Sequence, residues 1–229
     1  MLLRLYHLTV ASLYWYTVWY DQNFINIPFP KGLESYPLKG RTTFLTFWCL
    51  CMQTTYFTIA VLNDYVGTNV ANPKQNSILR SINDKLFILA FPTAFYVACA
   101  FWGIYAVDKD LIFPDHVAKE FPSWANHTMH TFVLIFITLE LTFTYRRYPS
   151  KATGFLIVLA FNLTYTLWFH YIYFETNSWV YPIFNVLNWP ARVVFITISC
   201  SIALVFYILG EKLNTLVWSK VSQQKIKSK

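Results

Sequence analysis

Charged side chains are scarce in this sequence: Asp, Glu, Lys and Arg together make up 13% of its 229 residues. About a quarter of the residues of a soluble domain are usually charged, so this chain has about half the charged residues of an ordinary soluble enzyme. Four cysteines and six glycines are too few for a disulfide scaffold or a collagen-like repeat. A hydrophobic content of 56% is too high for a disordered chain. The class that remains is a polytopic membrane protein.

The charged residues lie between six long windows that contain none. A helix needs about 20 apolar residues to cross a hydrocarbon core, and the windows reach or approach that length. They show no period-two alternation, which argues against barrel strands. The sequence therefore predicts an all-α polytopic membrane protein, with six transmembrane helices in one bundle and a single domain over residues 1–229. The predicted spans are about 3–20, 42–63, 86–107, 121–139, 152–174 and 193–210.

The distribution of Lys and Arg predicts the orientation of these spans. With six spans, both termini share one side with the loops 63–85 and 140–151, and this side holds 12 of the 18 Lys and Arg residues. Cytoplasmic loops carry such an excess, so we expect both termini in the cytoplasm. The net charge of +7 is then mostly a signal of topology. No motif supports a nucleic-acid partner.

Residues 215–229 form a basic tail that we expect to be cytoplasmic. Its lysines Lys225 and Lys227 are fifth and third from the end, which resembles the dilysine address for retrieval to the endoplasmic reticulum. The alternative is a solvated tail or one that contacts lipid headgroups. The sequence thus predicts an integral, multi-pass protein of the endoplasmic reticulum, the plasma membrane or both.

Polar side chains inside a span are costly, so each is a functional candidate. The fourth predicted span holds the densest group: Asn126 and His130 are four residues apart on one helix face, and His127 lies close by. Thr46 lies early in the second span and His170 late in the fifth. At 1.5 Å per residue, Thr46, His130 and His170 fall in the outer half of the bilayer. We expect them to line one pocket.

A threonine hydroxyl beside an imidazole is the starting point for nucleophilic acyl transfer. Thr46 supplies the hydroxyl and His130 a base that would activate it. An equally simple interpretation makes both residues structural, because threonines in membrane helices bond back to their own backbone and histidines join helices. The residues alone leave both interpretations open.

Other chemistries have weaker support. His127 and His130 have the spacing of metal ligands, but only four histidines lie beyond the first span, so we expect no metal and no cofactor. No G-x-S-x-G, H-E-x-x-H or glycine-rich phosphate loop is present. A transporter of small solutes or ions that uses Glu140 remains an alternative, although the chain lacks a visible internal repeat. A non-enzymatic regulator that binds partners in the membrane is the other.

Several motifs carry a resemblance over nearly the whole chain. They include Leu45-Thr46-Phe47, Leu89-Ala90-Phe91-Pro92, Asn126-His127-Thr128-Met129-His130-Thr131, Tyr148-Pro149-Ser150-Lys151, Trp179-Val180-Tyr181-Pro182 and Leu209-Gly210-Glu211-Lys212-Leu213-Asn214. In order and spacing, the chain resembles the androgen-induced-gene family of six-span membrane hydrolases. It departs from the family pattern at Ala125, where a leucine is usual, and at Thr42 and Thr43, where bulkier residues are common.

The resemblance implies a threonine hydrolase that acts on fatty acid esters of hydroxy fatty acids, a lipid substrate taken from the bilayer. The family's nucleophile falls on Thr46, and its histidine, the second in the N-H-x-M-H pattern, falls on His130. Around this pair we expect Asn126 to stabilise the oxyanion and Glu175 to orient the histidine. Expected pocket-lining residues are His127, His170, Thr42 and Thr43, and Lys39 or Arg41 is expected to hold the substrate's free carboxylate.

Overall fold

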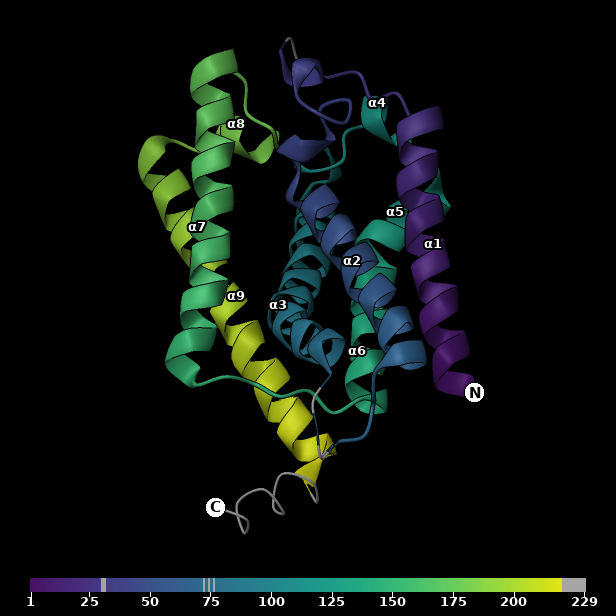
Figure 1. Cartoon of the computed structure of the whole chain (residues 1–229). Helices are drawn as coiled ribbons and strands as arrows, with labels where there is room; N and C mark the ends of the chain where they lie inside the picture. The colour runs from purple at the N-terminus through teal and green to yellow at the C-terminus, as the bar shows by residue number, and fades with distance from the viewer. Residues whose placement is uncertain (30–31, 72, 74, 76, 220–229) are drawn as a thin grey trace.

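The computed structural model describes residues 1–29, 32–71, 73, 75 and 77–219, and no strand occurs in this part of the chain. Its long helices form one bundle, with short helical turns gathered at one end (Figure 1). Helix α1 begins and helix α9 ends at the opposite end of the bundle (Figure 1). The long helices are α1 (Leu2–Phe24), α2 (Leu45–Val66), α3 (Ile78–Val107), α7 (Lys151–Thr176) and α9 (Trp189–Val217).

A sixth long stretch is a helix with a break in its regular spacing. It consists of α5 (Ser123–His127), a π-helical turn over Thr128–Phe132 and α6 (Val133–Phe143). The short elements make up what we call the cap, at the end of the bundle away from the chain ends. They are 3-10 turns at Leu33–Ser35, Arg41–Thr43 and Lys109–Leu111 and the short helices α4 (Asp115–Ala118) and α8 (Ile183–Val186).

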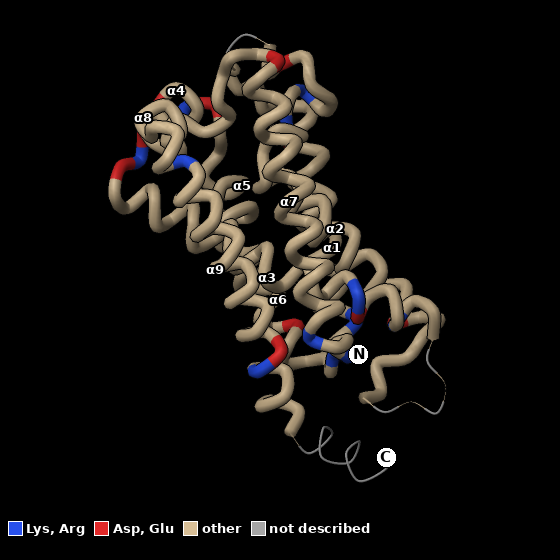
Figure 2. The backbone as a smooth tube through the Cα atoms, turned by 90° about the vertical axis from the view of Figure 1, so that its left-hand side faces the viewer, with Lys and Arg blue, Asp and Glu red and all other residues tan. Residues whose placement is uncertain are grey.

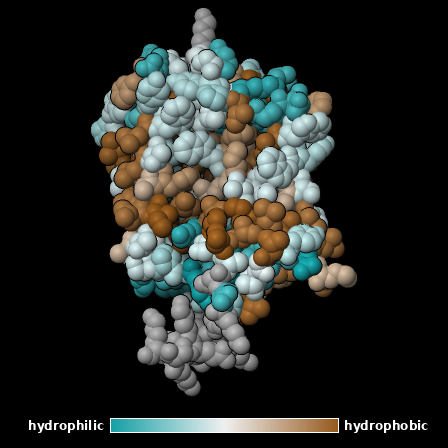
Figure 3. All heavy atoms as spheres, viewed as in Figure 1, coloured by the Kyte–Doolittle hydropathy of each residue, from teal (hydrophilic) through white to brown (hydrophobic). Residues whose placement is uncertain are grey.

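Four of the described helices, α2, α3, α7 and α9, are long and apolar enough to cross a membrane. Charged residues gather toward the two ends of the bundle (Figure 2), and an apolar band crosses the face shown in Figure 3. Helices α7 and α9 expose large apolar side chains, such as Leu167 at 72% and Val193 at 61% of their surface. Such faces suit contact with lipid. The prediction of an all-helical membrane protein is confirmed.

Helix ends differ from the predicted spans where local chemistry overrides the pattern of charges. Helix α3 begins at Ile78 rather than near residue 86, and its first turns contain two charged residues, Arg80 and Asp84, that are buried within the protein. Helix α2 begins at Leu45 rather than 42 because Phe44 has an extended backbone, with φ −96° and ψ 130°. Helix α9 continues past 210 to Val217. Residues 220–229 of the predicted basic tail lie outside the described residues.

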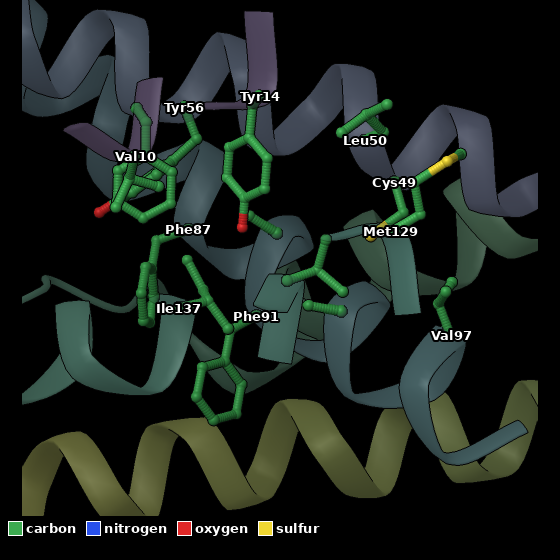
Figure 4. Packing of buried hydrophobic residues seen from close by; sticks show 14 of the residues in the cluster. Val10, Tyr14, Cys49, Leu50, Tyr56, Phe87, Phe91, Val97, Met129 and Ile137 are labelled. Atoms are coloured by element: carbon green, nitrogen blue, oxygen red, sulfur yellow. The ribbon is translucent and has the colours of Figure 1, made fainter. Parts of the chain in front are cut away.

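The main core lies where α2 and α3 meet α1 and the broken helix. In their most apolar windows, 50% of α2 and 56% of α3 is buried, against 17% for each of α7 and α9. Tyr14, Leu50, Phe91 and Ile137, one from each of the four elements, converge in this core (Figure 4). The packing holds the first half of α2 against the π-helical turn, which sets the distance between Thr46 and His130.

A buried polar cluster ties the helices together at the end of the bundle opposite the cap. Glu140 accepts hydrogen bonds through one oxygen from Tyr56 at 2.9 Å and from Arg146, and its other oxygen lies 2.9 Å from His7 Nε2. His7 Nδ1 lies 2.7 Å from Asp64. Because every member has a partner, this cluster joins α1, α2 and α6 rather than offering a free acid for transport.

Candidate active site

Thr46 lies in the first turn of α2, next to the cap. The Arg41–Thr43 turn and the extended Phe44 precede it, and Gly40 allows the turn by adopting a φ of 74°. A Cβ at Gly40 would lie 2.5 Å from the Leu33 carbonyl oxygen. Both the positive φ and the lack of space for a Cβ therefore require glycine at this position. Because α2 starts at Leu45, Thr46 has no helical carbonyl four residues earlier to accept its hydroxyl.

The Thr46 hydroxyl instead meets an imidazole from the broken helix. Thr46 Oγ1 lies 3.3 Å from His130 Nε2, across 84 residues of sequence. Later in α2, Thr54 and Thr58 donate to carbonyls of their own helix at 2.7 Å. Back-bonding therefore describes those two threonines but not Thr46, whose hydroxyl bonds only to His130 within the described part of the chain.

Two contacts fix the imidazole of His130. Its Nδ1 lies 3.0 Å from the backbone carbonyl oxygen of Asn126. A carbonyl can only accept, so Nδ1 carries the ring proton and Nε2 is left to accept from Thr46. The ring also stacks on Phe101, with centroids 3.6 Å apart and planes 15° from parallel. His130 belongs to the π-helical turn, a feature often found at functional sites.

Two cavities meet at this pair. The cap cavity, of about 320 Å³, lies under the cap elements, and its wall includes Arg41, His116, His130 and Asn185. The interhelical cavity, of about 110 Å³, lies between α3, α7 and α9 and is mainly apolar. Both cavities share four lining residues, which are Thr46, Phe101, Ile112 and Tyr181. A molecule with two arms joined near Thr46 matches this arrangement.

The start of α2 offers hydrogen-bond donors at the same point. The Leu45 N–H donates to the hydroxyls of both Tyr165 and Tyr181, each at 3.0 Å. The amides of residues 47 and 48 donate to the Phe44 carbonyl. Thr46 is the second residue of α2, and the first four amides of an α-helix have no acceptor within the helix. A free amide at the positive end of a helix dipole favours negative charge nearby.

Arg41 is buried in the wall of the cap cavity. Its Nε donates to both carboxylate oxygens of Asp21 at 2.9 Å, and Nη2 donates to the Ile25 carbonyl at 3.1 Å. Its Nη1 is buried and has no acceptor within the described ranges. Lys39, the other expected carboxylate ligand, is exposed and contacts Asn26 at 3.2 Å. Only Arg41 therefore lines a cavity that contains Thr46.

The other expected site residues lie away from the two cavities. Asn126 is buried and contributes its backbone carbonyl, but its side chain lines neither cavity. Glu175 is exposed near the end of α7, and the carbonyl of Asn126 takes the orienting position that we expected for its carboxylate. His127 is exposed and stacks on Trp102. The His170 ring donates through Nδ1 to the Thr166 carbonyl of its own helix, 2.7 Å away.

Thr42 and Thr43 also lie outside both cavities. Their hydroxyls donate to nearby carbonyls, Thr42 to Pro37 at 3.2 Å and Thr43 to Gly40 at 2.7 Å. We expected both to line the pocket, but they precede the extended Phe44 and so lie outside α2. Their hydroxyls stabilise the turn that positions Thr46.

Comparison with known proteins identifies the relatives of this chain. Residues 3–215 match the family described as FAR-17a/AIG1-like protein. The chain belongs to the FAR-17a/AIG1-like family. It is 32% identical to the androgen-dependent TFPI-regulating protein of Mesocricetus auratus, over 96% of this chain and 98% of that protein. It is 36% identical to the Homo sapiens androgen-induced gene 1 protein, over 78% of each. No solved structure matches the chain.

Sequence reasoning did not single out the tyrosine pair or the π-helical turn of this FAR-17a/AIG1-like protein. Tyr181 lies in one of the motifs that carry the family resemblance, Trp179-Val180-Tyr181-Pro182, but nothing in that motif indicates contact with Leu45. Tyr165 lies in an apolar window with several other aromatic residues. Only the folded chain distinguishes it from them.

Proposed function

We propose that this protein is an intramembrane hydrolase that cleaves the ester bond of fatty acid esters of hydroxy fatty acids, with Thr46 as nucleophile and His130 as base. One observation carries the proposal. The Thr46 hydroxyl lies 3.3 Å from the unprotonated nitrogen of an oriented imidazole, at the point where two cavities meet. A nucleophile within reach of a fixed base is the arrangement that acyl transfer requires. Membership of the FAR-17a/AIG1-like family is consistent with it.

The reaction runs in two steps and needs no metal or cofactor. Thr46 Oγ bonds to the ester carbonyl carbon while its proton passes to His130 Nε2 and the carbonyl π electrons move to oxygen. The resulting oxyanion accepts from the Thr46 N–H. Collapse of this intermediate expels the hydroxy acid, whose alkoxide takes the proton from His130. Water, deprotonated by His130, then cleaves the acyl-threonine and releases the fatty acid.

The two cavities suit the two arms of a branched ester. The apolar interhelical cavity takes the acyl chain, beside helices whose outer faces contact lipid. The cap cavity takes the hydroxy acid, whose free carboxylate reaches the unpartnered Nη1 of Arg41. Asp21 already balances the charge of Arg41, so the carboxylate gains a charge-assisted hydrogen bond rather than a full ion pair.

The membrane arrangement completes the proposal. All six long helical stretches span the bilayer as one domain, with both termini in the cytoplasm and the cap on the opposite side. Helix α1 starts and helix α9 ends at the same end of the bundle, which supports this arrangement (Figure 1). The excess of Lys and Arg on that side supports it as well. The compartment is the endoplasmic reticulum, the plasma membrane or both.

Ester hydrolysis by membranes that contain wild type, Thr46→Ala or His130→Ala at matched expression tests the function. The substrate is a hydroxystearate ester of palmitate, and a triglyceride serves as the control. We expect both variants to lose at least about a thousandfold in rate, because nucleophile and base act as one unit. Thr54→Ala, which removes a back-bonded hydroxyl from the same helix, should retain activity. Full activity in Thr46→Ala would exclude Thr46 as the nucleophile.

A non-enzymatic regulator is the second candidate, because the relatives include proteins named TFPI-regulating. The same variants separate the two functions. A regulator that acts by binding partners keeps its effect in Thr46→Ala, since that substitution removes one hydroxyl and leaves the exposed faces unchanged. An enzyme loses its effect together with its hydrolysis.

A further inference from the structure

We infer that the Tyr181 hydroxyl is a second oxyanion donor, acting together with the Thr46 N–H. This inference rests on the proposed hydrolase function and adds a catalytic residue to it. Tyr181 comes from the segment between α7 and α8, far from Thr46 in sequence. Its side chain lines both cavities at their junction, together with Thr46.

The position of the hydroxyl follows from its contacts. Tyr181 Oη lies 3.0 Å from the Leu45 backbone nitrogen. In an α-helix the next amide nitrogen, that of Thr46, lies roughly 3 Å further along the chain. An oxygen bonded to the Thr46 N–H on the cavity side is therefore within hydrogen-bonding reach of Tyr181 Oη. This is the point where the substrate carbonyl oxygen must lie when Thr46 Oγ attacks its carbon.

Counting protons shows that Tyr181 has one to donate. The Tyr165 hydroxyl donates to the Thr43 carbonyl at 3.0 Å, which has no hydrogen of its own to offer. The Leu45 N–H is shared between the two phenol oxygens. The Tyr181 hydrogen can then point only to Tyr165 Oη, 3.1 Å away, or into the cavity. Turning to an oxyanion exchanges a neutral hydrogen bond for a stronger, charge-assisted one.

Tyr165 holds Tyr181 in place, and its own hydroxyl hydrogen is donated to the Thr43 carbonyl. It is anchored on two backbone groups, Thr43 and Leu45, and fixes the phenol oxygen of Tyr181 through the third contact. Desolvation raises the pKa of Tyr181 to about 12, so its hydroxyl remains protonated at neutral pH. A preorganised neutral donor in apolar surroundings is what an oxyanion site requires.

The test compares an ester with its thionoester, in which sulfur replaces the carbonyl oxygen. Sulfur accepts hydrogen bonds weakly, so an enzyme with a working oxyanion site prefers the oxygen ester. We expect Tyr181→Phe to lower kcat for the palmitate ester of hydroxystearate about 100-fold with little change in KM. The ratio of oxygen ester to thionoester rates should fall at least about tenfold. This ratio is measured within one variant and is independent of how much protein folds.

Tyr165→Phe is the matched control, because each variant leaves the Leu45 N–H with one phenol acceptor. We expect it to keep the wild-type ratio, whatever its overall rate. If Tyr181→Phe is too slow to measure, 3-fluorotyrosine at position 181 keeps the shape and the donor and should retain both activity and ratio. An unchanged ratio in Tyr181→Phe would overturn the inference. Thr46→Ala, assayed alongside, tests the proposed hydrolase function itself. Full activity in that variant would contradict the function, whereas an unchanged ratio in Tyr181→Phe alone would contradict only the role of Tyr181.

Discussion

At the residue scale, the feature that sets Thr46 apart is its place in the helix rather than its residue type. Thr54, Thr55 and Thr58 belong to the same helix, and all three donate to carbonyls four residues earlier. Thr46 lies in the first turn, after an extended residue, so no carbonyl of the same helix lies four residues earlier to accept its hydroxyl. The same position leaves its amide without an acceptor inside the helix. One helix start thus supplies the hydroxyl and a donor for the charge that its attack would create.

Filling the interhelical cavity should shorten the acyl chain that the enzyme accepts. Ala100 lines this cavity but not the cap cavity, so we expect Ala100→Phe to lower kcat/KM for a palmitoyl ester at least about tenfold and to spare a butanoyl ester. The measurement is a series of esters of one hydroxystearate that differ in acyl length. Ala160→Phe, at an exposed position of α7, should leave the series unchanged. A uniform loss at all lengths in Ala100→Phe would contradict the assignment of the acyl arm.

Arg41 should determine the preference for a substrate with a free carboxylate. Replacing it alone would strand a buried Asp21, so the variant is Asp21→Asn with Arg41→Gln. A hydrogen bond to a charged group contributes about 1.5–3 kcal/mol, so the ratio of kcat/KM for the free acid to that for its methyl ester should fall about 10- to 100-fold. Asp21→Asn alone, assayed in the same way, shows how much of the change comes from the loss of the Asp21 charge. A ratio equal to that of wild type would remove Arg41 from the carboxylate site.

At the element scale, two glycines determine how closely α9 approaches α7 and α3. A Cβ at Gly154 of α7 would collide with the ring and hydroxyl of Tyr207 in α9. A Cβ at Gly210 of α9 would lie 2.7 Å from the ring of Phe91 in α3. Small residues of this kind allow membrane helices to approach closely. These two contacts bring α9 close to α7 and to α3 at positions outside the lining of the interhelical cavity.

We therefore expect Gly154→Ala and Gly210→Ala each to destabilise the protein by about 1–3 kcal/mol, the usual cost of overpacking. Gly103→Ala is the matched control, since a Cβ at this helical position meets nothing within 4 Å. It should be neutral or stabilise by about 0.5–1 kcal/mol through better helix propensity. Thermal unfolding in detergent measures all three. Equal unfolding temperatures would show that α9 shifts to accommodate the methyl groups at little cost.

At the scale of the whole molecule, the two ends of the bundle differ in chemistry. The end where α1 begins and α9 ends contains the buried cluster around Glu140, whose members bond to one another. The end with the cap holds both cavities and the Thr46–His130 pair. The buried polar cluster thus lies at one end and the candidate chemistry at the other.

Thiol labelling tests the proposed orientation of these ends. Glu34 in the cap and Lys151 at the start of α7 are both exposed and lie on opposite sides in the six-span arrangement. In sealed, right-side-out microsomes, an impermeant maleimide should label Lys151→Cys directly and Glu34→Cys only after detergent. The wild type, whose four cysteines lie in helices, serves as the background. Labelling of Glu34→Cys without detergent would contradict the orientation.

The sequence by itself determined the all-helical membrane class and the approximate position of each long helix. It did so because burial in lipid selects uncharged windows of a fixed length, which is a local property of the chain. The same reasoning placed Thr46 and His130 in the same half of the bilayer. Helix α3 begins before the predicted span, and its first turns contain Arg80 and Asp84, which are charged yet buried, so charge alone does not mark a helix end.

Tertiary structure alone decided how the candidate site is assembled. The contact between Thr46 and His130 depends on packing of α2 against the broken helix, and the pairing of Tyr165 with Tyr181 depends on how α7 approaches the start of α2. The partners of His130 and Arg41 also follow from the fold: a backbone carbonyl for the first and Asp21 for the second. Except for the contact of His130 with Asn126, four residues away, these contacts join residues distant in sequence, so hydropathy and spacing do not predict them.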